Sequence, residues 1–456
     1  MKQTILIILL LIATFIQAQE NPKQSLSLSL QEAINYGIKN NSAAINAGRD
    51  IEIAKQKKRE TTAMGLPQIN AGVDYLFNIK IQKTVIPADA FPSIDPNAPP
   101  PGPDDFFVTE FGTKQNLGTR ATLSQLIFDG SYIVALRASK TYLQYFQNYK
   151  QKTDNDVRQM IIDSYGNVLL AEESIVILEK NKTILDKTLS DTRETFKNGL
   201  IEEENVEQLQ ITQSSVNSSL NNARRLRDIA HNMLKINLGL KINDDLTLTD
   251  KLDSLTNDTL GSEMANSEFN LENNIDFKIG QNFVDQRKFE LQLERSKALP
   301  SLSSALNYGT NAFADKKFTF FQRDHRWFDY SNVGVSLNVP IFSSFARSAR
   351  KQQAAIAYDQ AKTLLTDAEQ KLRLQFANAK SQYEFSVEEY ANAKSNLALA
   401  ERIERKQQTK FTEGLSSSFD FAEAQRQLYA AQQNYLQSMV NVINRRAELE
   451  KITNGK

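Results

Sequence analysis

Cysteine is absent from this chain of 456 residues, and histidine occurs only twice. The absence of cysteine excludes disulfides, thiol chemistry, cysteine-ligated zinc and lipid attachment through an N-terminal cysteine. The two histidines, His231 and His325, lie far apart in the sequence, and we expect a structural role for each. The sequence also lacks a Ser/His/Asp arrangement, a metal-spaced cluster and a phosphate-binding glycine loop. We therefore expect a protein that is not an enzyme and that uses no cofactor or metal.

An excess of charge of either sign is missing as well. Lys and Arg together number 54, and Asp and Glu together also number 54. This balance gives no electrostatic reason to expect binding to nucleic acid or to an acidic substrate.

Long apolar runs are missing except at the N-terminus, which reads MKQTILIILLLIATFIQAQE. Lys2 is followed by the apolar stretch Ile5–Ile16 and by Ala18, a small residue at a plausible cleavage point. This pattern predicts a secretory signal peptide over residues 1–18. An N-terminal membrane anchor is the weaker interpretation, because the apolar run is shorter than about 18 residues. We therefore expect an exported protein whose insertion into a membrane, if any, is through strands.

The two halves of the chain carry the same series of motifs in the same order. The matching segments are GLPQINAGVDY (65–75) with ALPSLSSALNY (298–308), LSQLIFDG (123–130) with LNVPIFSS (337–344), and FKNGLIEEENVEQLQ (196–210) with FTEGLSSSFDFAEAQ (411–425). The first half is longer because it contains a proline-rich insertion at residues 87–105. The sequence therefore predicts a first repeat over 19–240, a connector over 241–270 and a second repeat over 271–456.

Each repeat is predicted to open with a helix, at about 30–64 and 271–297, and to continue with a strand hairpin, at about 67–128 and 300–342. Four segments alternate in polarity, although Gln125 and Leu126 interrupt the second one. In the fourth segment the apolar residues Val333, Val335, Leu337, Val339 and Ile341 oppose Gly334, Ser336 and Asn338. Alternating segments of roughly ten residues suit tilted transmembrane strands. A half-buried strand in a soluble sheet has the same period.

A long helix without proline is predicted after each strand hairpin, over about 131–197 and 345–410, and a shorter helix returns over 202–238 and 419–452. In the first long helix a seven-residue repeat predicts coiled-coil packing, and Lys182 interrupts it. Its members are Ile161, Val168, Ile175, Leu189 and Phe196. Gly199 and Gly414 are expected to end the long helices in the left-handed conformation, so each Phe-x-x-Gly-Leu motif is the tip of a helical hairpin.

The loops between the strands, at about 79–117 and 311–331, are predicted to face the outside of the membrane. The second loop is rich in aromatic residues, namely Phe318, Phe320, Phe321, Trp327 and Phe328. These side chains would form either a small core within the loop or a girdle at the membrane interface.

Four spanning strands cannot exist alone in lipid, because an open sheet leaves backbone groups unpaired at both edges, at several kcal/mol each. Single-chain barrels begin at about eight strands. If the strands are transmembrane, the chain must assemble, and this argument leaves the number of copies open.

The chain resembles the TolC-like outer-membrane channels of Gram-negative bacteria, also called outer membrane factors. The resemblance rests on the doubled order of Leu-Pro (66–67, 299–300), Ile-Phe (127–128, 341–342) and Phe-x-x-Gly-Leu (196–200, 411–415). It implies an α+β membrane protein in which three protomers form a 12-stranded β-barrel in the outer membrane. A long α-helical coiled-coil tunnel continues the barrel through the periplasm.

The resemblance also implies the function and the partners. A homotrimer, in contact with outer-membrane lipid, would be the exit channel of a tripartite efflux or type I secretion system. It would passively conduct substrates that an inner-membrane transporter delivers through a periplasmic adaptor. The alternatives are a periplasmic adaptor, which would have one helical hairpin between compact β-domains, and a coiled-coil structural protein without channel activity.

The hairpin tips are the predicted site of adaptor docking, through Phe196, Gly199, Leu200, Phe411, Gly414 and Leu415. By the same resemblance, Asp420 and Glu423 would form a ring of carboxylates at the periplasmic entrance. The family often has a basic residue that latches the tip, but Ser416 occupies that position here. An equally favoured alternative is that Asp420 caps the returning helix and Glu423 is a surface charge or its capping-box partner.

Overall fold

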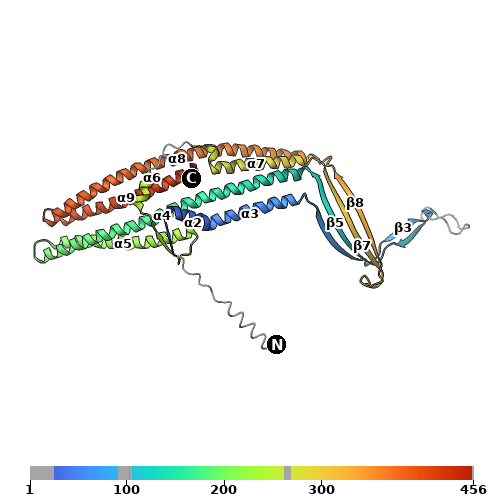
Figure 1. Cartoon of the computed structure of the whole chain (residues 1–456), viewed down its shortest axis with the longest axis horizontal. Helices are drawn as coiled ribbons and strands as arrows, with labels where there is room; N and C mark the ends of the chain where they lie inside the picture. Colours follow the sequence, from blue (N-terminus) through green and yellow to red (C-terminus); the bar gives the residue numbers. More distant parts are fainter. Residues whose placement is uncertain (1–24, 91–101, 103–104, 261–268, 454–456) are drawn as a thin grey trace, which may run out of the picture. The chain divides into compact units, whose positions relative to one another are not determined.

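Figure 1 shows a computed structural model of the chain, which describes residues 25–90, 102, 105–260 and 269–453. The predicted signal peptide, most of the proline-rich insertion and part of the connector lie outside these residues. The chain divides into two compact units, and each combines segments from both halves of the sequence. One unit takes its residues from 1–52, 144–282 and 363–456, and the other from 53–143 and 283–362.

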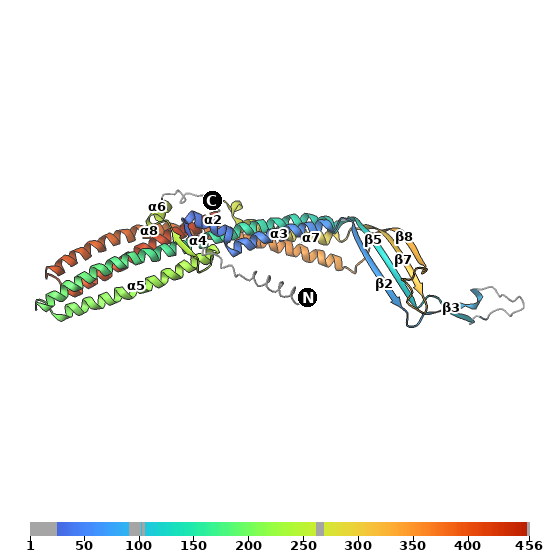
Figure 2. The same ribbon diagram turned by 60° about the horizontal axis from the view of Figure 1, so that its bottom comes forward.

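The second unit contains an antiparallel sheet formed by the four alternating segments. Its strands are β2 (Gln68–Phe77), β5 (Gln115–Asp129), β7 (Ser301–Ala314) and β8 (Trp327–Asn338), in the order β2-β5-β7-β8 (Figure 2). Strands β2 and β8 are therefore the two edges.

Two details of the strands differ from the pattern in the sequence. The interruption at Gln125 and Leu126 is a β-bulge, because the pairing with β7 shifts between Leu126 and Phe128. The last strand ends at Asn338, so Val339 and Ile341 lie beyond it. Pro340 has no N–H to donate to a ladder, which explains the end of the strand. The Arg347 guanidinium instead donates to the carbonyl oxygens of Pro340 and Ile341, at 2.7 and 3.0 Å.

The predicted outer loops contain structure of their own. A short hairpin of β3 (Lys83–Pro87) and β4 (Phe106–Glu110), with the 3-10 turn η1 (Ala88–Ala90), lies within the first loop. In the second loop Phe320 is only 1% exposed and packs with Leu117 and Ala312. Phe318 and His325 contact the Phe320 ring edge-on. Phe320 is therefore the centre of a small loop core, whereas Phe318, Phe321, Trp327 and Phe328 are exposed.

The first unit is built on two helical hairpins, which lie side by side in Figures 1 and 2. One joins α4 (Gly130–Lys197) to α5 (Glu203–Leu238), and the other joins α8 (Ala346–Thr412) to α9 (Ser418–Thr453). The predicted heptad positions Ile161, Val168 and Leu189 are at most 1% exposed. Lys182, which interrupts the repeat, pairs with Asp186 at 2.5 Å. The heptad is therefore the packing face of α4 from Ile161 to Leu189, whereas Phe196, its last member, is 36% exposed.

The helix expected at about 30–64 is two helices, α2 (Leu30–Asn40) and α3 (Ser42–Ala63). Asn41 separates them in an extended conformation, and its side chain accepts from the Ala43 N–H and donates to the Asn237 carbonyl. Gly239, with φ +81°, passes so close that a Cβ there would lie 2.2 Å from the Asn40 carbonyl oxygen. The interruption accommodates this contact. In the second half, α7 (Ile275–Ser296) follows a 3-10 turn, η3 (Leu271–Asn273).

Part of the predicted connector is ordered. Strand β6 (Asp245–Leu248) pairs in parallel with β1 (Ser25–Leu28), and α6 (Leu252–Leu260) follows it. The fully buried Tyr165 of α4 places its hydroxyl 3.1 Å from the Leu28 carbonyl oxygen and 3.1 Å from the Asp250 carboxylate. Desolvation raises the pKa of this phenol. Tyr165 therefore fixes the β1–β6 pair to the helices.

Candidate functional site

Both hairpin tips are built by the same backbone motif. Gly199 has φ +71°, and its N–H donates to the Phe196 carbonyl while the Leu200 N–H donates to the Thr195 carbonyl. Gly414 has φ +72°, with the corresponding bonds from Gly414 to Phe411 and from Leu415 to Lys410. These are Schellman caps, and a residue with a Cβ adopts this left-handed conformation at a cost. The prediction that Gly199 and Gly414 end the long helices in the left-handed conformation is confirmed.

The returning helices begin differently. Glu202 precedes α5 without a side-chain capping bond, so the acidic run there only complements the helix N-terminus. Before α9, Ser417 and Asp420 form a reciprocal capping box. The Asp420 N–H donates to Ser417 Oγ at 3.1 Å, and the Asp420 carboxylate accepts from the Ser417 hydroxyl and N–H at 2.8 and 3.3 Å. Ser417 is therefore the cap of α9 and Asp420 is its capping-box partner. The predicted capping box of Asp420 with Glu423 is not formed.

Glu423 lies one turn further along α9 and is engaged by two side chains. Its carboxylate accepts from the Arg426 guanidinium at 2.7 and 2.9 Å and from Gln427 at 2.9 Å. The hydrogen bond from Arg426 lowers the pKa of Glu423. Glu423 is thus ionised, but its charge is compensated locally. The sequence analysis did not select Arg426, although its i+3 spacing from Glu423 favours an ion pair.

The two tips are joined to each other. The Ser418 N–H, in the first turn of α9, donates to the Asn205 side chain in the first turn of α5, at 3.3 Å. Phe421 is fully buried and packs with Leu189 and Leu209 of the other hairpin. The contacts of Phe421 and Asn205 were not predicted, because they depend on tertiary pairing.

Apolar side chains remain exposed at the same tips. Leu200 and Leu415, which directly follow the two glycines, are 75% and 72% exposed, and Phe419 is 66% exposed. Each tip motif thus has an exposed leucine at the same position.

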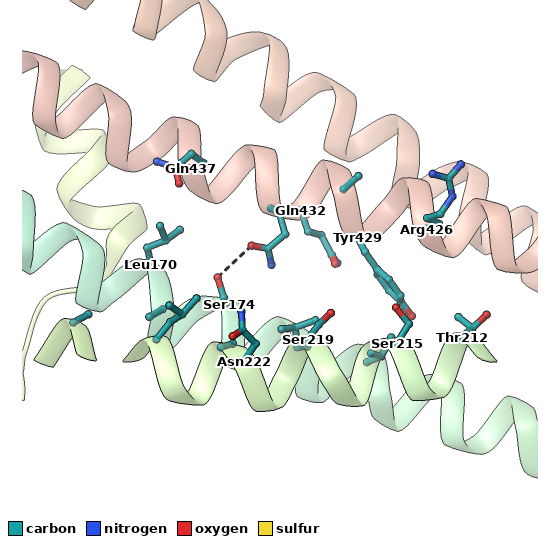
Figure 3. Close-up of a pocket in the computed structure, with 18 of the residues that line it drawn as sticks. Leu170, Ser174, Thr212, Ser215, Ser219, Asn222, Arg426, Tyr429, Gln432 and Gln437 are labelled. Carbon is teal, nitrogen blue, oxygen red and sulfur yellow. Dashed lines mark hydrogen bonds between the residues drawn. The ribbon is translucent and has the colours of Figure 1, made fainter. Parts of the chain in front are cut away.

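A cavity of about 960 Å³ is lined by residues of α4, α5 and α9 (Figure 3). Its lining contains apolar side chains, amides and hydroxyls. The Ser174 hydroxyl of α4 donates a hydrogen bond to the Gln433 side chain of α9, at 3.5 Å. Glu423 and Arg426 are among the lining residues. Ser215, Ser219 and Asn222 place polar side chains on one face of α5 at helical spacing, which indicates a polar helix face but not a cavity between three helices.

The sheet has one apolar and one polar face. On the apolar face Ile69, Val333 and Val335 are exposed by 75%, 75% and 68%. On the polar face Thr122 Oγ1 donates to Asn307 Oδ1 at 2.7 Å, and Asn307 Nδ2 donates to Asn332 Oδ1 at 3.0 Å. A row of hydrogen-bonded polar side chains thus crosses β5, β7 and β8. The opposite face is mostly apolar, although Asp329 and Ser331 lie on it, and Phe320 covers it at Leu117 and Ala312.

Two further points concern metal ions and membrane-spanning helices in the part of the chain that the structure describes. There, no group of three or more acidic, histidine or cysteine side chains is arranged to hold a metal ion. No helix among the described residues is both long enough and apolar enough to span a membrane.

Comparison with known proteins shows what this chain resembles in sequence and in fold. The family model described as "Outer membrane efflux protein" matches residues 269–455. The "Proteases secretion protein PrtF" of Dickeya chrysanthemi is 22% identical over 297 residues, which cover 62% of this chain and 61% of PrtF. The matched segment therefore spans less than two thirds of that relative.

Two solved structures share the fold over nearly the whole chain. A structure of CusC, described in terms of folding and transmembrane channel formation, matches with a TM-score of 0.73 and 16% identity, over 96% of each chain. The CmeC outer membrane channel of Campylobacter jejuni matches with a TM-score of 0.71 and 17% identity, over 93% of this chain and 85% of CmeC.

Proposed function

We propose that this chain, a member of the outer membrane efflux protein family, is the outer-membrane exit channel of a tripartite efflux or secretion system. Three copies form a 12-stranded barrel in the outer membrane, and their helical hairpins form a tunnel in the periplasm. The channel passively conducts substrates that an inner-membrane transporter delivers through a periplasmic adaptor.

The observation that carries this proposal is the polarity of the four-stranded sheet. Its apolar face is exposed along β2 and β8, and its other face bears amides and hydroxyls. Edge strands β2 and β8 each pair on one side only. In hydrocarbon each unpaired backbone group costs several kcal/mol, so the edges require partner strands. Closure by further copies satisfies both edges and encloses the polar face in a water-filled lumen.

The tips are the proposed contact with the adaptor. Leu200 and Leu415 are exposed at matching positions of the two hairpins. An apolar surface on two leucines, beside glycines that fix the backbone, suits a helical partner that buries apolar side chains. The relatives' names agree with a duct function, since CmeC is described as an outer membrane channel and PrtF as a secretion protein.

The test is conductance of the purified full chain in planar bilayers, together with outer-membrane fractionation and heat-modifiable migration on gels. A channel gives stable conductance and a heat-sensitive oligomer. A periplasmic adaptor or a coiled-coil structural protein gives a soluble fraction and no conductance, and that result would refute the proposal.

We also propose that Asp420, in three copies, forms a ring of carboxylates at the periplasmic entrance, with Glu423 beside it. Because Asp420 also caps α9, charge and capping must be separated. Asp420→Asn removes the charge but keeps an oxygen that can accept from Ser417, whereas Asp420→Ala removes both. A charge ring predicts lower cation preference and weaker block by multivalent cations in both variants. If only Asp420→Ala changes the channel, Asp420 acts by capping alone.

Glu423 needs its own control, because removing it leaves Arg426 unpaired. Glu423→Gln with Arg426→Gln removes both charges together and isolates the contribution of the pair. Asp367→Asn, an exposed carboxylate of α8 that pairs with Lys371 far from the tip, is the matched control. Unchanged selectivity in the double variant, with a reduced selectivity in Asp420→Asn, would assign the ring to Asp420.

A further inference from the structure

The polar face of the sheet carries very little charge. Over the four paired levels from Gln68 to Asp74 of β2, the register places sixteen side-chain positions on this face. Two of them are charged, Arg120 on β5 and Asp74 on β2. The others are small, amide, hydroxyl or aromatic. Arg120 is therefore the only charged side chain among the four residues that share its level on this face.

The neighbours of Arg120 leave its side chain room. It pairs with Gly72 on one side and with Gly309 on the other. A Cβ placed on Gly72 would meet no atom within 4 Å, so the space beside Arg120 over β2 is open. Within the described residues Arg120 has no ion-pair partner, and Asp74 on the next level does not reach it. Its five N–H donors are available to a solute.

A second donor lies on the same level. Gly309 pairs with Tyr330, and a Cβ on Gly309 would be 2.7 Å from the phenol Cζ and Oη of Tyr330. The Tyr330 ring therefore lies across β7, with its hydroxyl directed toward the strand that carries Arg120. The glycine is needed for this close approach. One level below, the hydrogen-bonded row Thr122, Asn307 and Asn332 is fixed by its own bonds.

We propose that Arg120, with Tyr330 beside it, is an oxyanion-recognition point on the lumen wall that favours solutes bearing carboxylate or phosphate groups. A guanidinium offers two parallel donors that match a carboxylate or phosphate, and a phenol adds a third. This inference rests on the proposed function, because it requires that the polar face line a lumen in several copies. Repeated around the barrel, the guanidinium also makes the local potential positive.

The experiment compares the wild-type channel with Arg120→Gln and Arg120→Lys in planar bilayers. The reversal potential in a potassium chloride gradient reports charge selectivity, and current block by citrate and by tripolyphosphate reports oxyanion binding. Arg120→Gln is expected to shift the reversal potential toward cation preference and to lose the block. Arg120→Lys is expected to keep the reversal potential but to weaken the block, because an ammonium lacks the planar fork.

Further variants test whether Arg120 recognises oxyanions specifically or only changes the charge of the lumen. Asp74→Asn is expected to shift the reversal potential in the opposite direction, and Tyr330→Phe to weaken the block without a shift. Ser124→Ala, on the same strand and face two levels away, is the matched control and should behave as wild type. Wild-type selectivity and block in an assembled Arg120→Gln channel would overturn this inference and leave the proposed function intact. A wild-type protein without conductance would instead refute the proposed function.

Discussion

Phe411 and Phe421 stack face to face at the end of the α8/α9 hairpin, with ring centroids 5.4 Å apart and planes 9° from parallel. Phe411 is the first residue of the tip motif, and Phe421 lies in the first turn after it. Since Phe421 also packs with Leu189 and Leu209, one aromatic pair closes its own hairpin and joins it to the other.

Phe421→Ala is expected to loosen both tips, because it leaves a cavity in a fully buried cluster. Truncating a buried Phe typically costs about 3–5 kcal/mol. Hydrogen exchange measured by mass spectrometry should show faster exchange in residues 185–220 and 400–430 than in the strands. Phe419→Ala is the control, since Phe419 is 66% exposed and two residues away. Equal protection of the tips in both variants would contradict the assigned role of Phe421.

Two glycines with positive φ, Gly414 and Gly239, provide a graded test of backbone strain. A Cβ on Gly414 would meet no atom within 4 Å, so Gly414→Ala adds only the left-handed strain, about 1–2 kcal/mol. A Cβ on Gly239 would in addition lie 2.2 Å from the Asn40 carbonyl oxygen. We expect Gly239→Ala to lower the thermal unfolding midpoint clearly more than Gly414→Ala. Gly414→Asn should be milder still, because Asn tolerates this conformation better than Ala.

The success of the sequence analysis at the tips has a local cause. A helix that ends in the left-handed conformation needs glycine at one position, and this requirement is visible in the sequence as Gly199 and Gly414. The heptad of α4 and the alternation of the strands are local periodicities of the same kind. All three were predicted and agree with the structure.

Features that depend on contacts between distant segments were not predicted. The break at Asn41 accommodates the backbone at Gly239, which lies against the Asn40 carbonyl. No residue near Asn41 in the sequence indicates this contact. Strand β6 pairs with β1, which lies at the opposite end of the first half of the chain. Because this partner is distant and the sequence around β6 is polar, the sequence predicts only a connector there. Likewise, the hydrogen bond from the Ser418 N–H to the Asn205 side chain joins residues that are far apart in the sequence, so the sequence alone does not predict it.

Glu404 offers a pH test of the α8/α9 hairpin. The residue is 7% exposed, and burial raises the pKa of its carboxyl above the ordinary value of 4.5, although the neighbouring Arg405 opposes this shift. The folded state then binds the proton more tightly than the unfolded state. The protonated Glu404 carboxyl therefore favours the folded state at low pH. This contribution is lost as the pH rises from the pKa of Glu404 in the unfolded state through its pKa in the folded state.

Glu404→Gln is therefore expected to raise the thermal unfolding midpoint at about pH 7.5 and to change it little at about pH 4, where the carboxyl is protonated in both states. The neighbouring groups that act here are the charged Arg405 on α8 and the Tyr429 phenol on α9. Burial, and then the Glu404 carboxylate, raise the pKa of Tyr429. Glu401→Gln, an exposed neighbour on α8, serves as the control. A midpoint that rises equally at both pH values would exclude an ionisation effect.

The last prediction concerns the two faces of β8, where neighbouring residues should respond oppositely to the same substitution. Val333 is in the middle of the strand, opposite Leu306, and is 75% exposed on the apolar face. Val333→Arg should destabilise the assembled barrel by about 2–4 kcal/mol, since it places a charge in hydrocarbon near the midplane. Asn332→Arg, one residue away on the polar face, should assemble normally and alter conductance instead. Leu337→Arg, on the apolar face near the end of the strand, should have a smaller effect, because the cost falls to about 0–1 kcal/mol near the interface. The measurement is the fraction of heat-modifiable oligomer in outer membranes, with single-channel conductance of each variant that assembles. Equal assembly of the Val333 and Asn332 variants would show that the apolar face of β8 does not meet lipid.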